Sequence, residues 1–125
     1  MKREEINLLS ESVLGAVFEV SNSLGSGFLE KVYEKALLRE LGILGIRVES
    51  QVPYSIGYKG GCVGEYFADL LVERALLVEL KCVERLGNEH AAQCMNYLKA
   101  SGLSVCLPVN FQRPRVEYRR IVLNF

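Results

Sequence analysis

Three features are scarce in this sequence of 125 residues: net charge, closely spaced cysteines and long apolar runs. Lys and Arg number 15, as do Asp and Glu, so the net charge is zero and no global electrostatic attraction for nucleic acid exists. Any such binding must come from a local patch. The four cysteines form no Cys-x-x-Cys pair, which argues against a zinc site. No stretch approaches ~18 apolar residues, so we expect no membrane contact.

What the chain does contain is apolar material, at 50% of its residues. That content and the length predict one compact domain over residues 1–125 with a substantial core. The cysteines lie in apolar or mixed runs, so we interpret them as reduced core residues of a cytoplasmic protein. The N-terminus leads into an amphipathic pattern and not into a secretion signal.

Two helices are predicted first, over residues 4–23 and 28–42, because apolar residues recur at spacings of three and four. Glycines at 25 and 27 end the first helix and Gly42 ends the second. The expected apolar face of the second helix consists of Leu29, Val32, Ala36 and Leu37.

From Arg47 the hydrophobic period changes to two, which predicts strands. One strand runs to Tyr58, a hairpin turn follows at residues 59–61, and a second strand continues through Asp69. Pro53 is typical of an edge strand. After a tight turn at residues 73–75, a third strand begins at Leu76.

A third helix is expected from Asn88, as its N-cap, to about Ser101. The strand that follows, over residues 103–111, should lie parallel to the third strand because a crossover helix joins them. A last strand is predicted over residues 116–123. The fold class is therefore α/β with a mixed sheet, in the order α-α-β-β-β-α-β-β.

The central strands carry charges where a buried strand should be apolar: Asp69 in one, Glu79 and Lys81 in the next. Buried charges are costly unless they are paired or bind a metal. Glu79 and Lys81 share a face, and a hairpin brings Asp69 beside Glu79. Two carboxylates suit Mg²⁺ or Mn²⁺, with Lys81 near the reacting phosphate. The alternative is a cross-strand salt bridge.

Other candidates are weaker on spacing alone. Glu30 and Tyr33 lie three apart near the start of the second helix and so share a face. Gln93 and Tyr97 form a stripe on the third helix with His90, where they could hold a phosphate, a base edge or the attacking water. Arg119 and Arg120 belong to the one cluster of cations, which suits either a nucleic acid backbone or a solvated sheet edge.

This order of elements resembles the core of the PD-(D/E)xK nuclease superfamily, in which an Asp and a Glu-x-Lys on adjacent strands build a metal-dependent phosphodiesterase site. More specifically, the chain resembles the small GxxExxY family. Ala68 replaces the proline of the superfamily name, and Phe67 stands where a polar or basic residue is expected. The blocks that carry the resemblance are Gly27-Phe28-Leu29-Glu30-Lys31-Val32-Tyr33, Val63-Gly64-Glu65-Tyr66, Ala68-Asp69-Leu70-Leu71-Val72, Val78-Glu79-Leu80-Lys81, Gln93-x-x-Asn96-Tyr97-Leu98-Lys99-Ala100 and Asn110-Phe111.

The resemblance implies Asp69 and Glu79 as metal ligands, with Glu30 as the helix acid that faces the metal. It implies Lys81 as the catalytic lysine, supported by Gln93 and Tyr97. Tyr33, Arg119 and Arg120 are the candidate nucleic-acid contacts.

These residues predict a Mg²⁺- or Mn²⁺-dependent nuclease that hydrolyses phosphodiester bonds with a metal-activated water, acting on DNA in preference to RNA. The alternative is a non-catalytic module of the same fold that binds nucleic acid or protein. A chain this short has little surface for sequence-specific recognition, so a homodimer or a partner protein is a reasonable expectation.

Overall fold

The computed structural model describes all 125 residues as three helices and a six-stranded sheet. This confirms the expected mixed α/β class and the order α-α-β-β-β-α-β of the first seven elements. The elements are α1 (Arg3–Leu24), α2 (Glu30–Ile43), β1 (Val48–Tyr58), β2 (Gly61–Val72), β3 (Leu76–Lys81), α3 (Asn88–Ser101), β4 (Val105–Asn110), β5 (Glu117–Tyr118) and β6 (Ile121–Val122).

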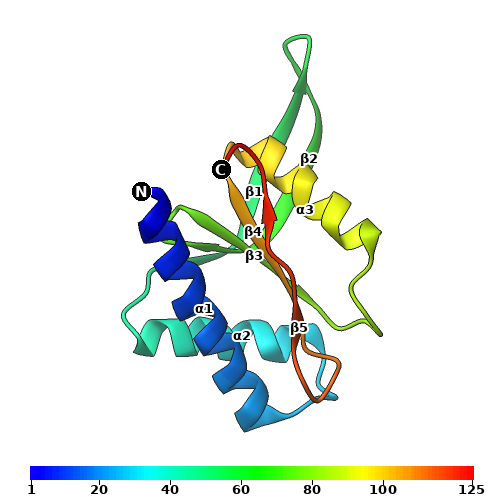
Figure 1. The fold of residues 1–125 in the computed structure, drawn as a ribbon. Helices are drawn as coiled ribbons and strands as arrows, with labels where there is room; N and C mark the ends of the chain where they lie inside the picture. The colour runs from blue at the N-terminus through cyan, green and yellow to red at the C-terminus, as the bar shows by residue number, and fades with distance from the viewer.

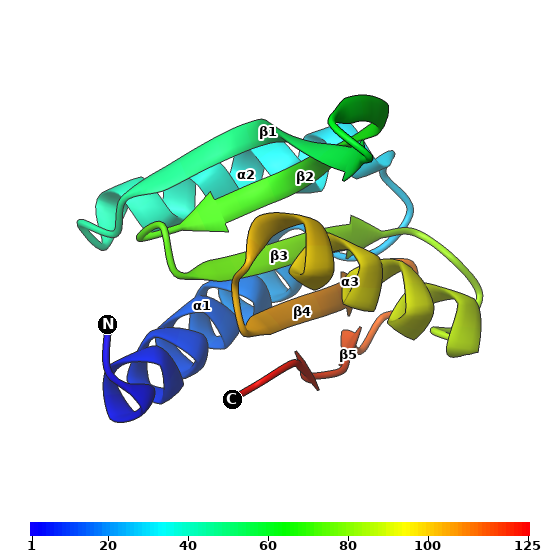
Figure 2. The ribbon, with the colours of Figure 1, turned by 90° about the horizontal axis from the view of Figure 1, so that it is seen from above.

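The sheet has the strand order β1-β2-β3-β4-β5, and β6 also pairs with β4. β1, β2 and β3 are antiparallel neighbours, whereas β3 and β4 are parallel because α3 crosses over between them. Figure 2 shows α1 and α2 on one face of the sheet and α3 on the other. No helix combines the length and the apolar character that crossing a membrane requires.

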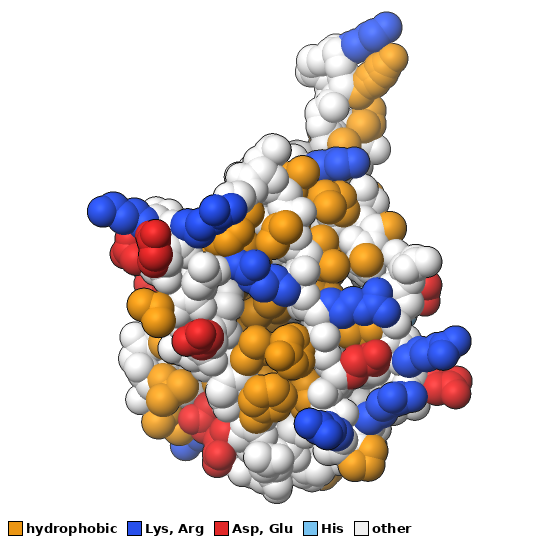
Figure 3. All heavy atoms as spheres, viewed as in Figure 1, with side chains coloured by type: hydrophobic (Ala, Val, Ile, Leu, Met, Phe, Trp, Pro, Cys, Tyr) orange, Lys and Arg blue, Asp and Glu red, His pale blue; other side chains and the backbone are white.

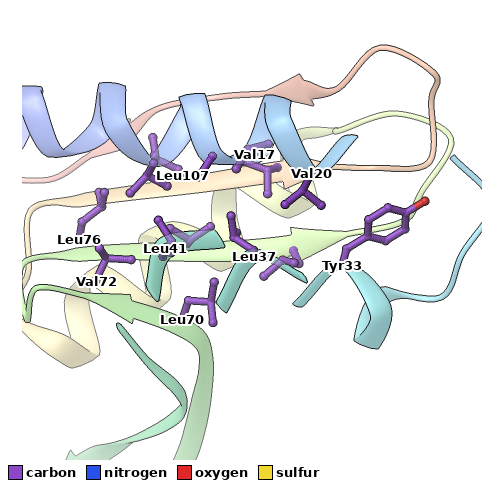
Figure 4. Packing of buried hydrophobic residues seen from close by; sticks show 14 of the residues in the cluster. Val17, Val20, Tyr33, Leu37, Leu41, Leu70, Val72, Leu76 and Leu107 are labelled. Atoms are coloured by element: carbon purple, nitrogen blue, oxygen red, sulfur yellow. The ribbon is translucent and has the colours of Figure 1, made fainter. Parts of the chain in front are cut away.

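Two hydrophobic clusters hold these layers together, one on each face of the sheet. The larger lies between the sheet and helices α1 and α2 (Figure 4), and the smaller lies beneath α3. On β3, Val78 and Leu80 belong to the larger cluster, whereas Leu77 belongs to the smaller. Side chains alternate along a strand, so Glu79 and Lys81 face α3. The charged positions of β3 therefore share one side of the sheet.

The buried face of α2 differs from the face that its sequence predicts. Of the expected residues, Leu37 is fully buried and Ala36 packs against the larger cluster, whereas Leu29 and Val32 are exposed. Tyr33 and Leu41 are buried in their place. The helix begins at Glu30, so Leu29 precedes it as the N-cap residue. The packed stripe is therefore rotated by about one residue, which separates Tyr33 from exposed Glu30.

Three further expectations need correction. The single last strand is two short segments, β5 and β6, because the chain leaves the sheet at Arg119 and Arg120. Asn88 is the first residue of α3 and not its cap; Gly87 precedes the helix, and its N–H donates to His90 Nδ1. Cys62 is exposed, so not every cysteine is a core residue.

The β1–β2 hairpin extends well beyond the body of the molecule as an arm (Figures 1 and 3). Its strands do not keep one face throughout. Val48 packs against the larger cluster and Val52 against the smaller, although a regular strand turns residues four apart to the same side. Between them lies Gln51, whose φ is 53°. The pleat is thus interrupted beside Asp69, where the candidate site begins.

Candidate active site

Asp69 and Glu79 are joined where strands β2 and β3 part. The backbone pairing of these strands ends at Leu70 and Val78. At the next position, carboxylates replace carbonyl groups as hydrogen-bond acceptors. Glu79 Oε1 accepts the N–H of Asp69 at 3.1 Å, and Asp69 Oδ2 accepts the N–H of Leu80 at 2.8 Å. The two carboxylates are therefore held side by side by the backbone, and the hairpin brings Asp69 beside Glu79 as expected.

Glu79 is almost completely buried, with 2% of its surface exposed. Burial raises the pKa of its carboxyl group to about 9, and the neighbouring charge of Asp69 adds to the rise. Lys81 opposes this shift only weakly. The Glu79 carboxyl is thus protonated at neutral pH in the free protein, and a bound cation would favour its ionised form.

Lys81 lies at the end of β3 and reaches the helix on the same side of the sheet. Its Nζ donates to Gln93 Oε1 at 2.6 Å. The side chain is partly buried. The structure contains no salt bridge between Lys81 and either carboxylate. The salt-bridge interpretation of these charges is therefore wrong.

Tyr97 supports the same region from α3. Its hydroxyl donates to the carbonyl oxygen of Phe67 at 3.1 Å, and its ring meets Tyr66 edge to face. Burial raises the pKa of Tyr97, and the nearby acids Glu79 and Asp69 raise it further. Tyr97 therefore stays neutral and acts as a positioning residue that fixes β2 against α3.

Glu30 has no hydrogen bond to either of the two carboxylates. It is exposed and lines a hollow with Cys82 and Gln112, and its charge helps to raise the pKa of the Cys82 thiol. Cys82 follows Lys81 on the chain and packs against the larger cluster on the opposite side of the sheet. No hydrogen bond joins Glu30 to Asp69 or Glu79 in the structure, and its role as the helix acid of the site stays a prediction.

Glu34, one turn further along α2, occupies a position closer to the site. It is buried, with 8% exposed, and its Oε1 accepts a hydrogen bond from Gln51 Nε2 at 3.3 Å. The same nitrogen lies 3.4 Å from Asp69 Oδ1. Gln51 thus links the acid of α2 to the acid of β2. Neither residue was singled out from the sequence; the available signal was an acid four residues after Glu30, on the same side of the helix.

Tyr33 is a core residue and not a nucleic-acid contact. It is fully buried, and its ring stacks on Phe111 with 4.5 Å between centroids. Its hydroxyl donates to the carbonyl of Gly25 at 2.6 Å and accepts the N–H of Phe28 at 3.3 Å. Tyr33 therefore fixes the loop between α1 and α2, at the end of the cluster in Figure 4.

Arg119 and Arg120 do not form a joint cationic patch. Arg119 donates to the carbonyl of Leu86, which precedes α3. Arg120 donates to Asn7 on α1, and its guanidinium lies over the ring of Phe125. Successive residues in extended chain point to opposite sides, which separates the two. Both are exposed, yet they face different parts of the molecule.

The donors at the site suit a hard divalent cation. Mg²⁺ is usually held by one or two carboxylates, with waters and phosphate oxygens completing its coordination. Asp69 and Glu79 supply those carboxylates, and Glu79 Oε2 accepts no hydrogen bond from the protein. No group of three or more His, Cys, Asp or Glu side chains gathers in the structure. The donor set thus fits Mg²⁺ or Mn²⁺ with an open coordination shell and does not fit a closed structural site.

Comparison with known proteins agrees with this geometry. Residues 7–121 match the family model of the PD-(D/E)XK nuclease superfamily. The match covers most of the chain, so the chain belongs to this superfamily. No curated protein matches the sequence significantly.

Among solved structures, the fold is similar to that in the "Crystal structure of SSO0001", with 17% sequence identity and a TM-score of 0.61. The similarity covers 76% of this chain and 50% of the other, so this chain spans about half the length of that relative. At this identity the similarity shows the fold alone.

Proposed function

We propose that this chain is a metal-dependent nuclease that hydrolyses phosphodiester bonds in nucleic acid, DNA in preference to RNA. The observation that carries the proposal is the pair Asp69 and Glu79, locked together at the fork between β2 and β3, with Lys81 on the face of Glu79. Membership of the PD-(D/E)XK nuclease superfamily supports it. Within that superfamily, we place the chain in the GxxExxY family on its sequence blocks.

In the proposed reaction, Asp69 and Glu79 would hold the cation. Glu34 would help to position Asp69 through Gln51, whose amide lies within hydrogen-bond distance of both carboxylates. A bound Mg²⁺ or Mn²⁺ supplies Lewis acidity and lowers the pKa of a nearby water. Lys81 stabilises the negative charge that develops on the phosphate oxygens, and Gln93 holds its ammonium group in place. Glu79 must lose its proton when the cation binds, because its carboxyl is protonated in the free protein.

The first test is calorimetric titration with Mg²⁺ and Mn²⁺, followed by cleavage assays on single- and double-stranded DNA and RNA. Wild type should bind the metal and cleave. Glu79→Gln and Asp69→Asn should lose metal binding, whereas Lys81→Met should bind the metal yet lose cleavage by at least ~100-fold, since it removes charge stabilisation only.

The matched control is Glu65→Gln, which neutralises an exposed carboxylate on the same strand as Asp69 and should leave both readouts unchanged. Wild type that binds DNA but cleaves nothing in either metal would contradict the nuclease proposal. That result would favour a non-catalytic binding module on the same fold.

We further propose that the 125 residues act as one nuclease-like domain, and that a second copy or a partner protein extends its surface for substrate binding. Sedimentation equilibrium with and without DNA measures this. A monomer that cleaves at full rate would contradict the need for a second copy.

A further inference from the structure

A pocket of about 340 Å³ lies between β2 and α3, directly beside Lys81. Its lining consists of Tyr66, Glu89, Ala92, Gln93, Asn96 and Tyr97. Gln93 belongs both to this lining and to the site, because its Oε1 accepts the hydrogen bond from Lys81. A molecule that reaches Lys81 with one group can therefore place a second group in the pocket.

Two tyrosines form the aromatic part of the pocket. The rings of Tyr66 and Tyr97 lie 5.4 Å apart, centroid to centroid, at an interplanar angle of 63°. Tyr97 is buried and its hydroxyl is tied to the backbone of Phe67, so it supports Tyr66 rigidly. Tyr66 keeps 37% of its surface exposed. It therefore offers a supported ring on which a planar group can stack.

The polar side chains of the lining have hydrogen-bond donors and acceptors that are not used within the protein. The oxygen of Gln93 is occupied by Lys81, which leaves its NH₂ group as a donor. Asn96 is exposed, and its side chain makes no hydrogen bond within the protein. Glu89 is 74% exposed in its side chain and lies 3.6 Å from His90 Nδ1. That nitrogen already accepts the N–H of Gly87, so it offers Glu89 no proton.

The charge of the lining decides what kind of group fits. Its only ionised side chain is the carboxylate of Glu89, and it contains no Lys or Arg. A phosphate would be repelled here, whereas the N–H groups on the edge of a nucleobase would find acceptors in Glu89 and Asn96. The lysine that suits a phosphate lies just outside, at the end of β3.

We propose that this pocket binds one unpaired nucleobase next to the phosphate held at Asp69, Glu79 and Lys81. The base stacks on Tyr66, and its edge contacts Asn96, Gln93 and Glu89. A base within a duplex is stacked and has its edge engaged by its partner, so only a single-stranded or extruded base can enter. This inference rests on the proposed nuclease function and narrows its substrate to nucleic acid with an unpaired nucleotide at the cleavage position.

The test is the affinity of a short fluorescein-labelled single-stranded oligonucleotide, and of its duplex, in Ca²⁺. Tyr66→Ala should weaken single-strand binding about tenfold, the typical effect of removing one stacking platform. Tyr66→Phe should bind as wild type, since the ring remains. Asn96→Ala should lose affinity for a normal strand but not for one with an abasic nucleotide at the bound position. Duplex affinity should not change in any variant.

The matched control is Tyr58→Ala, which removes an exposed tyrosine from the arm, outside the pocket. Circular dichroism melting checks that Tyr66→Ala is folded. The inference is overturned if Tyr66→Ala binds single strands as wild type does, if it loses single-strand and duplex affinity equally, or if wild type binds neither. If Tyr66→Ala cleaves as wild type does, base binding in the pocket is contradicted and the nuclease proposal stands. If binding depends on Tyr66 but no cleavage occurs in Mg²⁺ or Mn²⁺, base binding stands and the nuclease proposal is contradicted.

Discussion

At the scale of single residues, Glu79 is the most deeply buried acidic or basic side chain in the molecule. It is buried beside a second carboxylate and has no lysine partner to neutralise it. Proteins tolerate such a group by protonating it or by binding a cation to it. The protein thus gives up stability at this position, as often happens where function and folding make opposite demands.

Glu79→Gln should stabilise the metal-free protein increasingly as the pH rises. The pKa of Glu79 is about 9 in the folded state against an ordinary value of 4.5, so only the folded state holds the proton between these values. Stability therefore falls as pH rises through this window, by about 3 kcal/mol at pH 7, and the Gln variant avoids the loss. Thermal unfolding in EDTA between pH 5 and pH 9 measures the difference.

Glu65→Gln is the control for this series, because it makes the same chemical change at an exposed carboxylate on β2. If the difference in stability between wild type and Glu79→Gln were the same at every pH, the pKa of Glu79 would not be raised in the folded state.

The residues that could be recognised from sequence are those whose charge conflicts with their surroundings. Asp69, Glu79 and Lys81 interrupt apolar strands, and period-two alternation placed the last two on one face. Glu34 and Gln51 could not be recognised in this way. Their role depends on the rotation of α2 and on the interrupted pleat at Gln51, and neither is encoded by local periodicity.

At the scale of elements, the strands and their pairing followed from sequence more closely than the helix faces did. The turns at Lys59-Gly60 and at Glu73-Arg74 have the positive φ angles that such tight turns need, and Pro53 lies on the edge strand β1. The face of α2 was misjudged because Tyr33 was treated as a surface residue. A tyrosine satisfies its hydroxyl locally and can then be buried completely, as here against Gly25.

Tyr33→Phe should lower the free energy of unfolding by about 1–2 kcal/mol, because it leaves the carbonyl of Gly25 and the N–H of Phe28 without their partner. Oligonucleotide affinity should not change. Urea denaturation and the binding assay measure the two quantities. Tyr58→Phe is the control, since that hydroxyl is exposed and makes no hydrogen bond within the protein. Lost binding at unchanged stability would restore Tyr33 as a nucleic-acid contact.

At the scale of the whole molecule, charge is balanced and dispersed. Cationic and acidic side chains are interspersed on the face in Figure 3, and Arg119 and Arg120 point apart. Few phosphates can therefore be neutralised at once. In the proposed nuclease, attraction to nucleic acid would therefore depend on the cation, on Lys81 and on contacts with bases.

The affinity for single-stranded DNA should consequently depend only weakly on salt. Two or three neutralised phosphates give a slope of about −2 in a plot of log affinity against log salt concentration. Fluorescence anisotropy across a series of KCl concentrations measures it. Arg120→Gln should leave the slope unchanged, because Arg120 is engaged with Asn7 and Phe125. A slope several times steeper would reveal a basic surface that the structure does not show.

The hydrogen bonds between the two carboxylates and the backbone have one more consequence. The N–H groups of Asp69 and Leu80 donate to carboxyl oxygens, and not to carbonyl groups as their neighbours in the sheet do. Any change in the charge of these carboxyl acceptors alters the chemical shifts of the two amide protons directly. Their resonances in a ¹⁵N-correlated NMR spectrum should thus move with metal and with pH, while those of Leu77 and Val78 stay nearly fixed. The backbone itself reports the state of the site, without an attached probe or a substrate.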